Sequence, residues 1–449
     1  MLSALFSLQQ TAQKTPDKIA VIEGEQHVSY HDLVCYISGT MAHFKGVQKT
    51  YALWADNSLE WLVTDLALMA LGKTVIPIPP FFSSEQIGHI QQDAKIDCVL
   101  VDLTIYSSNT NFEVTSGAQK IIYTSGTTGK PKGVIHGCKQ LNQSIKALMQ
   151  AADVMPDDIH LSVLPFALLL EQICGIYIPL SAGCTTVLAT EVSKACAQGK
   201  LGPLVEMSQE INPTTCVLVP QQLKGWVATL EATQNKAPKS LRFIAVGGAP
   251  VPQNLTEKGW NVGLPIYEGY GLSECCSVVC VNYKKRHKLG TVGKALSHIT
   301  LTIEDNEIVL SGPSLMEGYL NQPPLTHSKY YTGDIGSLDN NGFLTVYGRK
   351  DDVIVTSYGR NINAKWVEAM IVSDARILSC TITGHGQEYV SATITLSNIG
   401  QEWAKGFQGD EQIKDLINML TFYAPDYARP KKCHVTNLNS NTQELEYQL

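Results

Sequence analysis

Residues 121–137 of this chain read Ile-Ile-Tyr-Thr-Ser-Gly-Thr-Thr-Gly-Lys-Pro-Lys-Gly-Val-Ile-His-Gly, a short apolar run that ends in glycines, hydroxyls and lysines. Glycines let the backbone point several N–H groups at one anion, and hydroxyl and ammonium groups add further donors. The segment is not a Walker A loop, because Gly126-x-x-Gly129-Lys130 is two residues too short and Pro131 replaces the magnesium-binding Ser or Thr. We therefore predict a polyphosphate-binding loop, with a plain surface loop as the alternative.

Composition restricts the class of protein. With 449 residues, the chain is long enough for two or three domains. The net charge of −7 argues against general nucleic-acid binding, although the basic runs 284–288 and 429–432 could meet an acidic partner. The twelve cysteines form no CxxC pair, which is typical of reduced thiols in a cytoplasmic protein. The N-terminus lacks a signal-peptide pattern and no apolar run reaches about 18 residues, so no transmembrane helix is expected.

The order of apolar runs predicts an α/β fold. Strands are expected at 51–55, 74–78, 98–101, 121–124, 214–219 and 241–246, and helices at 59–71, 84–94, 140–152, 221–233 and, buried, 164–182. Strands that alternate with helices indicate βαβ units and parallel sheets. Short strands at 299–303, 307–311 and 343–346, separated by turn residues, indicate a β-rich subdomain. After residue 350 the pattern restarts with a strand at 353–355, a helix at 365–372 and further elements at 375–382 and 411–423, so we predict an N-terminal domain of residues 1–349 and a small α+β C-terminal domain of residues 350–449.

Further short motifs follow the loop in the chain. They are Val246-Gly247-Gly248-Ala249-Pro250, Tyr267-Glu268-Gly269-Tyr270-Gly271-Leu272-Ser273-Glu274, Tyr331-Thr332-Gly333-Asp334 and Gly348-Arg349. Taken singly, each is compatible with an ordinary turn. Together and in this order, with residues 124–133, they resemble the motifs of the adenylate-forming superfamily, which contains acyl-CoA synthetases, peptide-synthetase adenylation domains and firefly-type luciferases.

The resemblance implies an ATP site with assigned roles. The loop residues Thr124, Ser125, Gly126, Thr127, Thr128, Gly129, Lys130 and Lys132 would bind the phosphates, with Thr124 and Lys132 also taking part in catalysis. Gly247, Gly248, Ala249 and Pro250 would flank the adenine, together with Glu268, Gly269 and Gly271. Tyr270 would stack on the base, Ser273 would bind the α-phosphate and Glu274 would hold Mg²⁺, which prefers oxygen ligands. Asp334 would accept the ribose hydroxyls, and Arg349 would lie at the ribose or phosphates.

One family feature is missing from the sequence. The superfamily has a lysine in a Gly-Lys context near the C-terminus, which bridges the substrate carboxylate and the α-phosphate. Here the region 438–449 contains no lysine, and the last lysines are Lys431 and Lys432. Three alternatives follow: one of these lysines substitutes, the enzyme adenylates weakly without the bridge, or the chain is a degenerate member that binds nucleotide or acyl-adenylate without full catalysis.

The resemblance also implies a second half-reaction. Lys350 or Asp351 occupies the family's hinge position, about which the C-terminal domain would rotate. The segment Ser357-Tyr358-Gly359-Arg360-Asn361-Ile362 resembles the part that then enters the active site, so Tyr358 and Gly359 would line the channel for a pantetheine thiol.

The acid side of the site is expected to be apolar. Residues 164–172, Leu-Pro-Phe-Ala-Leu-Leu-Leu-Glu-Gln, resemble the Leu-Pro-x-x-His-x-x-Glu-Arg motif of fatty-acyl-CoA synthetases, with Leu168 and Gln172 in place of His and Arg. Leu168, Leu169 and Cys275 are candidate pocket walls, and a plain core role is the alternative. We expect an ATP-dependent ligase that activates a fatty or aromatic carboxylic acid and transfers it to CoA, with an acidic acyl carrier protein as the rival acceptor.

Overall fold

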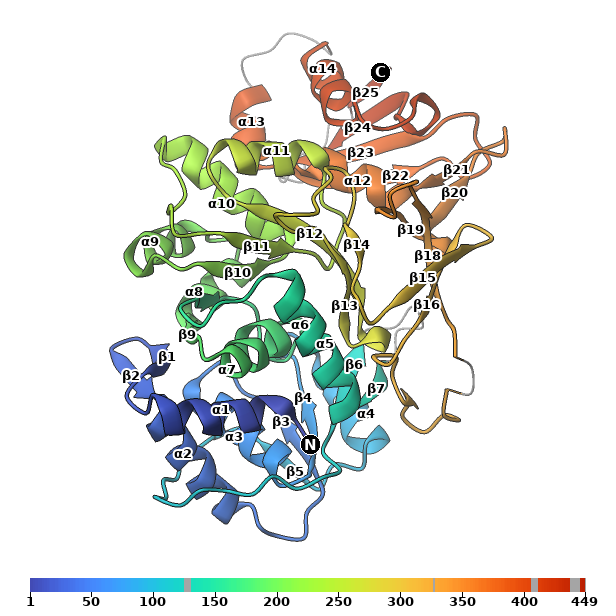
Figure 1. Ribbon diagram of the computed structural model, residues 1–449. Helices are drawn as coiled ribbons and strands as arrows, with labels where there is room; N and C mark the ends of the chain where they lie inside the picture. The colour runs from blue at the N-terminus through green and yellow to red at the C-terminus, as the bar shows by residue number, and fades with distance from the viewer. Residues whose placement is uncertain (125–130, 326–327, 405–410, 437–444, 449) are drawn as a thin grey trace.

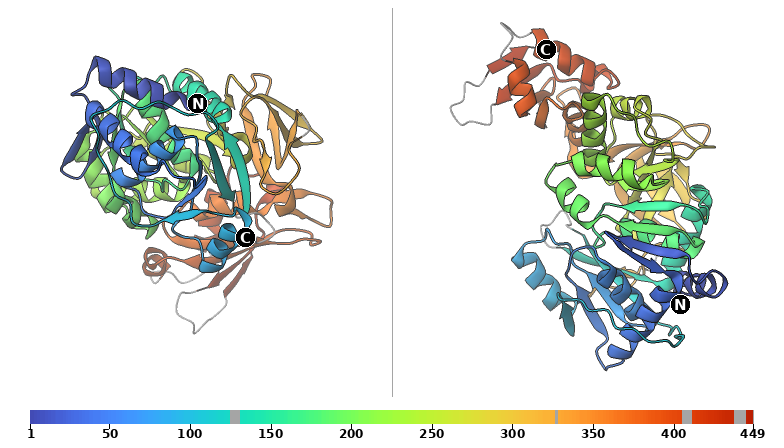
Figure 2. Two further views of the ribbon diagram at one scale, coloured as in Figure 1. Left: turned by 90° about the horizontal axis from the view of Figure 1, so that it is seen from below. Right: turned by 90° about the vertical axis from the view of Figure 1, so that its left-hand side faces the viewer.

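The computed structural model describes residues 1–124, 131–325, 328–404, 411–436 and 445–448. It has mixed α/β architecture, with a large N-terminal part built on parallel sheets and a smaller C-terminal part at one end of the molecule (Figures 1 and 2). The expected fold class is confirmed.

The sheet nearest the N-terminus carries the phosphate-loop motif. Its strand order is β17-β7-β6-β4-β3-β5, with the bounds β3 Thr50–Leu53, β4 Thr74–Pro77, β5 Cys98–Leu100, β6 Gln119–Thr124, β7 Lys132–Gly137 and β17 Gly318–Tyr319. Strands β3, β4, β5 and β6 run parallel, whereas β6 and β7 form an antiparallel hairpin. Thr124 therefore lies opposite Lys132, at the two ends of the glycine-rich segment.

Helices cover this sheet and begin where side chains can cap them. The helices of this region are α1 Ser3–Lys14, α2 Tyr30–His43, α3 Leu59–Ala70 and α4 Ser84–Asp93. Ser58 accepts a hydrogen bond from the backbone N–H of Trp61 at the start of α3, and Ser83 and Gln86 form a capping box at α4. Such caps satisfy backbone N–H groups that a helix leaves unpaired. The two helices accordingly begin within one residue of the predicted positions.

A second, larger sheet lies beside the first. Its order is β14-β13-β12-β11-β10-β8-β9-β1-β2, with the bounds β1 Ile19–Glu23, β2 Gln26–Ser29, β8 Ile159–Ser162, β9 Thr185–Leu188, β10 Thr215–Leu218, β11 Phe243–Val246, β12 Ile266–Leu272, β13 Ser277–Val281 and β14 Lys294–Ala295. Its helices are α5 Cys138–Ala151, α6 Leu169–Glu171, α7 Ile178–Ala182, α8 Thr190–Ala197, α9 Gly202–Ile211, α10 Pro220–Thr233 and α11 Gln253–Asn261. Strands β8, β10, β11 and β12 are parallel neighbours, so their carboxyl ends lie at one edge. Parallel sheets commonly place ligand sites at this edge.

The predicted buried helix at 164–182 is only partly correct. Residues 163–168 form an irregular segment, followed by α6, a π-helical turn Gln172–Tyr177 and α7. The turn of Leu168 is closed by a hydrogen bond from its backbone N–H to the Pro165 carbonyl, 2.9 Å. π-helical turns are frequent at functional sites.

The rest of the chain forms smaller sheets. The β-rich subdomain contains β15 Thr300–Glu304, β16 Glu307–Ser311, β18 Tyr330–Leu338 and β19 Leu344–Arg349. Beyond it lie β20 Val353–Val355, β21 Asn361–Asn363, α12 Ala364–Val372, β22 Ile377–Thr383, β23 Ser391–Leu396, α13 Asn398–Ala404, α14 Glu411–Leu420, β24 Lys432–Thr436 and β25 Leu445–Gln448. Buried residues between Ile362 and Val435 form a hydrophobic core of their own. Across the part of the chain that the structure describes, no helix is long and apolar enough to cross a membrane.

A buried ion pair joins the first sheet to its helices. Lys120 on β6 and Asp65 on α3 are both fully buried and form a salt bridge, and the Tyr177 hydroxyl donates to the second Asp65 oxygen at 2.8 Å. Burial lowers the pKa of Lys120, while Asp65 opposes this shift. The pair ties together three elements far apart in the sequence, and neither charge has access to water.

We predict that Asp65→Ala destabilises the fold strongly. Removing one partner of a buried ion pair leaves an uncompensated charge, with an expected loss of about 3–5 kcal/mol in the free energy of unfolding. Urea denaturation measures it. The matched control is Lys285→Ala, which breaks a pair with Asp153 whose side chains are both 77% exposed, and such exposed pairs contribute about 0–1 kcal/mol. Equal losses in the two variants would contradict the prediction.

Candidate functional site

An apolar cavity with a volume of about 270 Å³ lies against the parallel strands of the second sheet. At the carboxyl ends of β11 and β12 it is lined by residues that the sequence motifs singled out: Gly247, Gly248, Gly269, Tyr270, Gly271 and Ser273. Its wall on the helical side includes Leu168, Leu169 and Leu170. The adenine-side motifs and the apolar acid-side motif therefore line a single cavity.

Close packing explains why glycines occupy the shared end of the cavity. Because β11 and β12 are adjacent, the chain leaving β11 passes directly beside β12. A Cβ atom on Gly247 would lie 2.9 Å from the carbonyl oxygen of Gly269, so a larger residue would push the strands apart. Gly248 has φ +83°, a left-handed conformation that favours glycine. Both residues keep a flat, open surface at this edge.

Three predicted nucleotide-binding residues contact one another. The Tyr270 hydroxyl donates to Asp334 Oδ2 at 2.5 Å, and Arg349 Nη1 lies 3.4 Å from Asp334 Oδ1 and donates to the Thr332 carbonyl at 2.9 Å. Burial raises the pKa of Asp334, against the effect of its hydrogen bond to Tyr270 and of Arg349. An aromatic ring, a carboxylate and a guanidinium are thus gathered from β12, β18 and β19.

A second set of polar side chains surrounds Glu274. Its Oε1 accepts a hydrogen bond from the Tyr319 hydroxyl at 2.7 Å, and that hydroxyl is 3.1 Å from the Tyr330 hydroxyl. The ammonium group of Lys132 lies 5.7 Å from the centre of the Tyr319 ring. Glu274 Oε2 makes no hydrogen bond within the described ranges, so it is available as an oxygen ligand. No group of three or more His, Cys, Asp or Glu side chains suited to a metal occurs among the residues described, so a cation here would need oxygens from a ligand or water.

His136 is a neighbour of this site that the sequence analysis missed. It is fully buried on β7, and its Nε2–H donates to the Ser273 carbonyl at 2.6 Å. Burial lowers its pKa to about 4, although the hydrogen bond to Ser273 opposes the shift. His136 therefore remains neutral at physiological pH and fixes the backbone between Ser273 and Glu274. The sequence signal that could have identified His136 was its position directly after the loop motif, on a strand that faces the next motif.

Several predicted site residues do not line the cavity. Glu268 points into the protein, where it accepts a hydrogen bond from Thr256 at 2.8 Å, and Cys275 packs in the separate core of the β-rich subdomain beside Ser314. Ala249 and Pro250 are exposed beyond Gly248. Glu268 is turned toward Thr256 on α11, whereas Cys275 ends a short 3₁₀ turn that directs its side chain into the core of the β-rich subdomain.

The C-terminal candidates also lie away from the cavity lining. Lys431 Nζ pairs with Asp426 at 3.1 Å, and Lys432 begins β24, opposite Ser391. Lys350 pairs with Glu307 at 3.3 Å, and Asp351 follows it in a short 3₁₀ turn. Tyr358 and Gly359 form the exposed turn between β20 and β21. The loop candidates Ser125, Gly126, Thr127, Thr128, Gly129 and Lys130 fall outside the described residues.

Comparisons with known proteins agree with this geometry. The model of the AMP-binding enzyme family matches residues 8–121 and 119–320. A 2-succinylbenzoate–CoA ligase of Bacillus mycoides (strain KBAB4) is 27% identical, with 97% of this chain and 96% of the relative covered. Two solved structures of the o-succinylbenzoate CoA synthetase MenE from Bacillus subtilis share the fold. The complex with the acyl-adenylate OSB-AMP has a TM-score of 0.78, 24% identity and coverage of 96% and 94% of the two chains. The complex with ATP and magnesium has a TM-score of 0.79 and 23% identity, with 98% of this chain and 96% of that chain covered.

The fold and the cavity thus define an enzyme that forms acyl-adenylates, an acid–thiol ligase of the AMP-forming class. The chain belongs to the AMP-binding enzyme family, within the adenylate-forming superfamily.

Glu268 gives a prediction about pH. Burial raises its pKa from 4.5 to about 7, so the folded protein holds an extra proton between these values and the free energy of unfolding falls as the pH rises through them. At about 1.4 kcal/mol per pKa unit, the loss by pH 8 is about 3 kcal/mol. Glu268→Gln should remove this loss in urea denaturation measured from pH 4.5 to 8. The control Glu231→Gln, at an exposed position of α10, should keep it, and an unchanged pH dependence in Glu268→Gln would refute the assignment.

Proposed function

We propose that this chain couples an apolar, aromatic or fatty, carboxylic acid to coenzyme A, with ATP and Mg²⁺. The observation that carries the proposal is the single cavity that has leucines on its wall and the Gly247–Gly248 and Gly269–Ser273 segments at its end. The relatives described above include a CoA ligase and structures of complexes with ATP, magnesium and an acyl-adenylate.

The proposed first step is in-line attack of the acid's carboxylate on the α-phosphorus of ATP, with pyrophosphate as the leaving group. The base would stack on Tyr270, and Asp334 would accept hydrogen bonds from the ribose hydroxyls once Tyr270 releases one of its oxygens. Arg349, already 3.4 Å from Asp334, would keep that carboxylate ionised in spite of its burial. Ser273, with its backbone held by His136, would donate to the α-phosphate.

Mg²⁺ fits the environment of Glu274. The ion takes one or two protein carboxylates and completes its shell with phosphate and water oxygens. Glu274 has one oxygen held by Tyr319 and the other available, and Lys132 adds a positive charge nearby. When bound, the ion would supply charge stabilisation for the triphosphate. Thr124 would face the same phosphates from the other end of the loop, because it pairs with Lys132.

The second proposed step transfers the acyl group from adenylate to the CoA sulfur, with release of AMP and a proton. It requires residues 350–449 to move as a domain about Lys350 and Asp351. Polar contacts now join that part to the rest of the chain: Lys224 Nζ donates to the carbonyls of Val372 and Ile377 at 2.5 and 3.1 Å, Asn254 donates to the Ser373 hydroxyl at 3.0 Å, and the Tyr423 hydroxyl donates to Glu257 at 3.1 Å. Rotation of the domain would have to break them. Movement would bring the exposed turn at Tyr358 and Gly359 toward the cavity as the thiol channel.

Two alternatives from the sequence lack support. The relatives described above are named for CoA as acceptor and for a full ligase activity, so neither a carrier-protein acceptor nor a degenerate binding protein has a known counterpart among them. In the first half-reaction, we propose that Lys431 or Lys432 serves as the bridging cation.

The proposal predicts pyrophosphate release from ATP-Mg²⁺ that depends on an acid and is accelerated by CoA. The measurement is a coupled pyrophosphate assay across fatty and aryl acids, with CoA or a phosphopantetheinyl carrier protein. Asp334→Asn should raise the KM for ATP by about tenfold or more, because a hydrogen bond to a charged group contributes about 1.5–3 kcal/mol. Asp305→Asn, at an exposed position in the turn between β15 and β16 of the same subdomain, is the control. If ATP binds but no acid causes pyrophosphate release, the proposed ligase activity is rejected.

Two variants should affect the two half-reactions differently. Lys431→Ala/Lys432→Ala should lower adenylate formation by about 100-fold, since a preorganised charge in the transition state is worth about 3–4 kcal/mol. Asp351→Pro should spare adenylate formation and abolish thioester formation, because proline restricts rotation of the hinge backbone. Acid-dependent ATP–pyrophosphate exchange reports the first reaction and chromatography of the acyl-CoA product reports the second. Unchanged exchange in the double variant would exclude the substitute lysine, and equal loss of both reactions in Asp351→Pro would exclude the hinge.

A further inference from the structure

The far end of the cavity lies where the parallel strands begin. There it is lined by Asp158, His160 and Thr215, whereas the glycine-lined end lies at residues 247 and 248. Thr215 pairs with Phe243, four residues before Gly247, which at about 3.3 Å per residue puts the two ends about 13 Å apart. An acid whose carboxylate reaches the adenylate end would therefore direct its tail toward Asp158.

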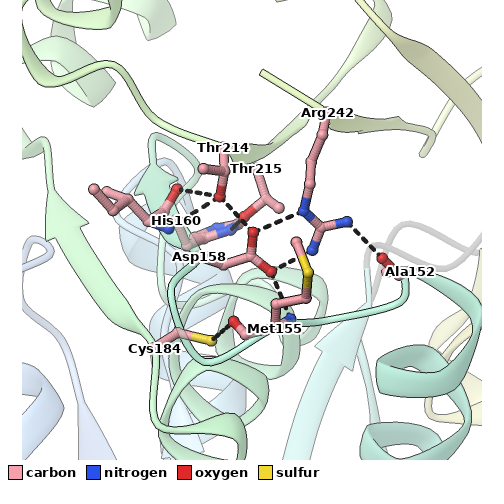
Figure 3. Close-up of polar contacts among 9 residues, drawn as sticks. Ala152, Met155, Asp158, His160, Cys184, Thr214, Thr215 and Arg242 are labelled. Carbon is pink, nitrogen blue, oxygen red and sulfur yellow. Dashed lines mark hydrogen bonds and ion pairs between the residues drawn. The ribbon is translucent and has the colours of Figure 1, made fainter. Parts of the chain in front are cut away.

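Asp158 is the charged residue among the described cavity lining, and its charge is already compensated (Figure 3). Arg242 Nε donates to its Oδ1 at 2.7 Å, and Arg242 Nη2 forms a salt bridge with Oδ2. The Thr214 hydroxyl and the Met155 backbone N–H add hydrogen bonds at 2.7 and 2.8 Å. Although burial opposes ionisation, these partners keep the pKa of Asp158 below its usual value. The carboxylate is thus ionised and fully engaged.

The Arg242 guanidinium is already bonded within the protein and is not free to pair with a charged ligand. Besides the two bonds to Asp158, its Nη1 donates to the Ala152 carbonyl at 2.8 Å (Figure 3). All three guanidinium nitrogens are therefore committed, and the arginine lies behind the lining rather than in it.

Among the described residues, the remaining polar groups near this end are a histidine, two hydroxyls and a second carboxyl group. His160 Nδ1 shares a hydrogen bond of 3.0 Å with the Thr215 hydroxyl, and its Nε2 lies 3.7 Å from Glu171 Oε1. Glu171 is fully buried and accepts a hydrogen bond from Ser162 at 2.5 Å. Any positive charge on His160 would face this carboxylate. Within the described lining no lysine or arginine is present.

A second carboxylate on the acid would have no counter-ion here. The Bacillus relative is named for 2-succinylbenzoate, which carries two carboxylates, so one stays ionised after the other is joined to AMP. Burying an ionised carboxylate is strongly unfavourable unless it is paired, and the nearby guanidinium of Arg242 is already paired with Asp158.

We infer that this enzyme selects monocarboxylic acids with an uncharged tail against dicarboxylic acids, and that the Asp158–Arg242 pair at the far end of the cavity is the determinant. The inference rests on the proposed function for the identity of the acid-binding cavity. Asp158 acts by cancelling the charge of Arg242, so that the tail meets a surface without a net positive charge.

A matched pair of acids tests the inference. 2-Succinylbenzoate and 3-benzoylpropanoate differ only in the ring carboxylate, and octanedioate and octanoate form a second pair. Of the two monocarboxylic acids, we take the one with the higher kcat/KM for pyrophosphate release. We expect its kcat/KM to exceed that of the matching dicarboxylic acid by about 100-fold or more, and its affinity measured by calorimetry to exceed it by a similar factor. A dicarboxylic acid that equals or exceeds its partner would overturn the inference, as would failure of both monocarboxylic acids to bind.

Asp158→Asn then tests the determinant. It leaves the Arg242 charge uncompensated, so the preference for the monocarboxylic acid should shrink by about tenfold. Asp153→Asn, at an exposed position on the same connection between α5 and β8, should leave it unchanged. An unaltered preference in a folded Asp158→Asn would exclude the pair as the determinant. If that variant does not fold, the two affinities of the wild-type protein still decide the selectivity. Absence of pyrophosphate release with every acid would reject the ligase activity, while the measured affinities would still test the selectivity.

Discussion

The parallel pairing of β11 with β12 is the constraint on which the rest of the site depends. It sets the Gly247–Gly248 turn against the backbone of Gly269 and so fixes the shape of one end of the cavity. It also directs Tyr270 toward Asp334, which arrives on a strand of another sheet. A side chain at Gly247 would separate these segments. Close backbone packing here therefore shapes the end of the cavity where the adenine base is proposed to bind.

Charge is distributed along the cavity in an uneven way. Glu274, Lys132, Asp334 and Arg349 gather beyond the glycine-lined end, where a triphosphate and its metal would need them. The walls are leucines, and at the other end Asp158 and Arg242 cancel each other. Such a gradient positions an amphipathic ligand with its polar group at one end, since an unpaired charge is tolerated only where partners or water exist. The proposed orientation and chemical class of the acid both depend on this distribution of charge.

Much of the fold followed from local patterns. Six parallel strands, β3, β4, β5, β6, β10 and β11, and helices such as α3 and α10 lie within two residues of the predicted ranges, because alternating apolar runs and N-terminal caps are local signals. The parallel strands β8 and β9 were not predicted. The region 164–182 was predicted less well. Its apolar composition suits a continuous helix, but the chain first forms a turn at Pro165 and then a π-helical turn. Packing around the cavity, rather than propensity, determines the backbone there.

The sequence by itself determined the superfamily and the α/β class, and it proposed a set of residues for the nucleotide, because glycines, hydroxyls and carboxylates at fixed spacing are typical of phosphate-binding sites. Only the tertiary structure decided which of these residues meet. Glu268 is turned away from the cavity toward Thr256, and a 3₁₀ turn places Cys275 in another core. The sheet arrangement brings His136 to Ser273 and Arg242 to Asp158 across long separations in the chain. Contacts of this kind depend on the sheet register and on the burial of charges, which no single stretch of sequence encodes.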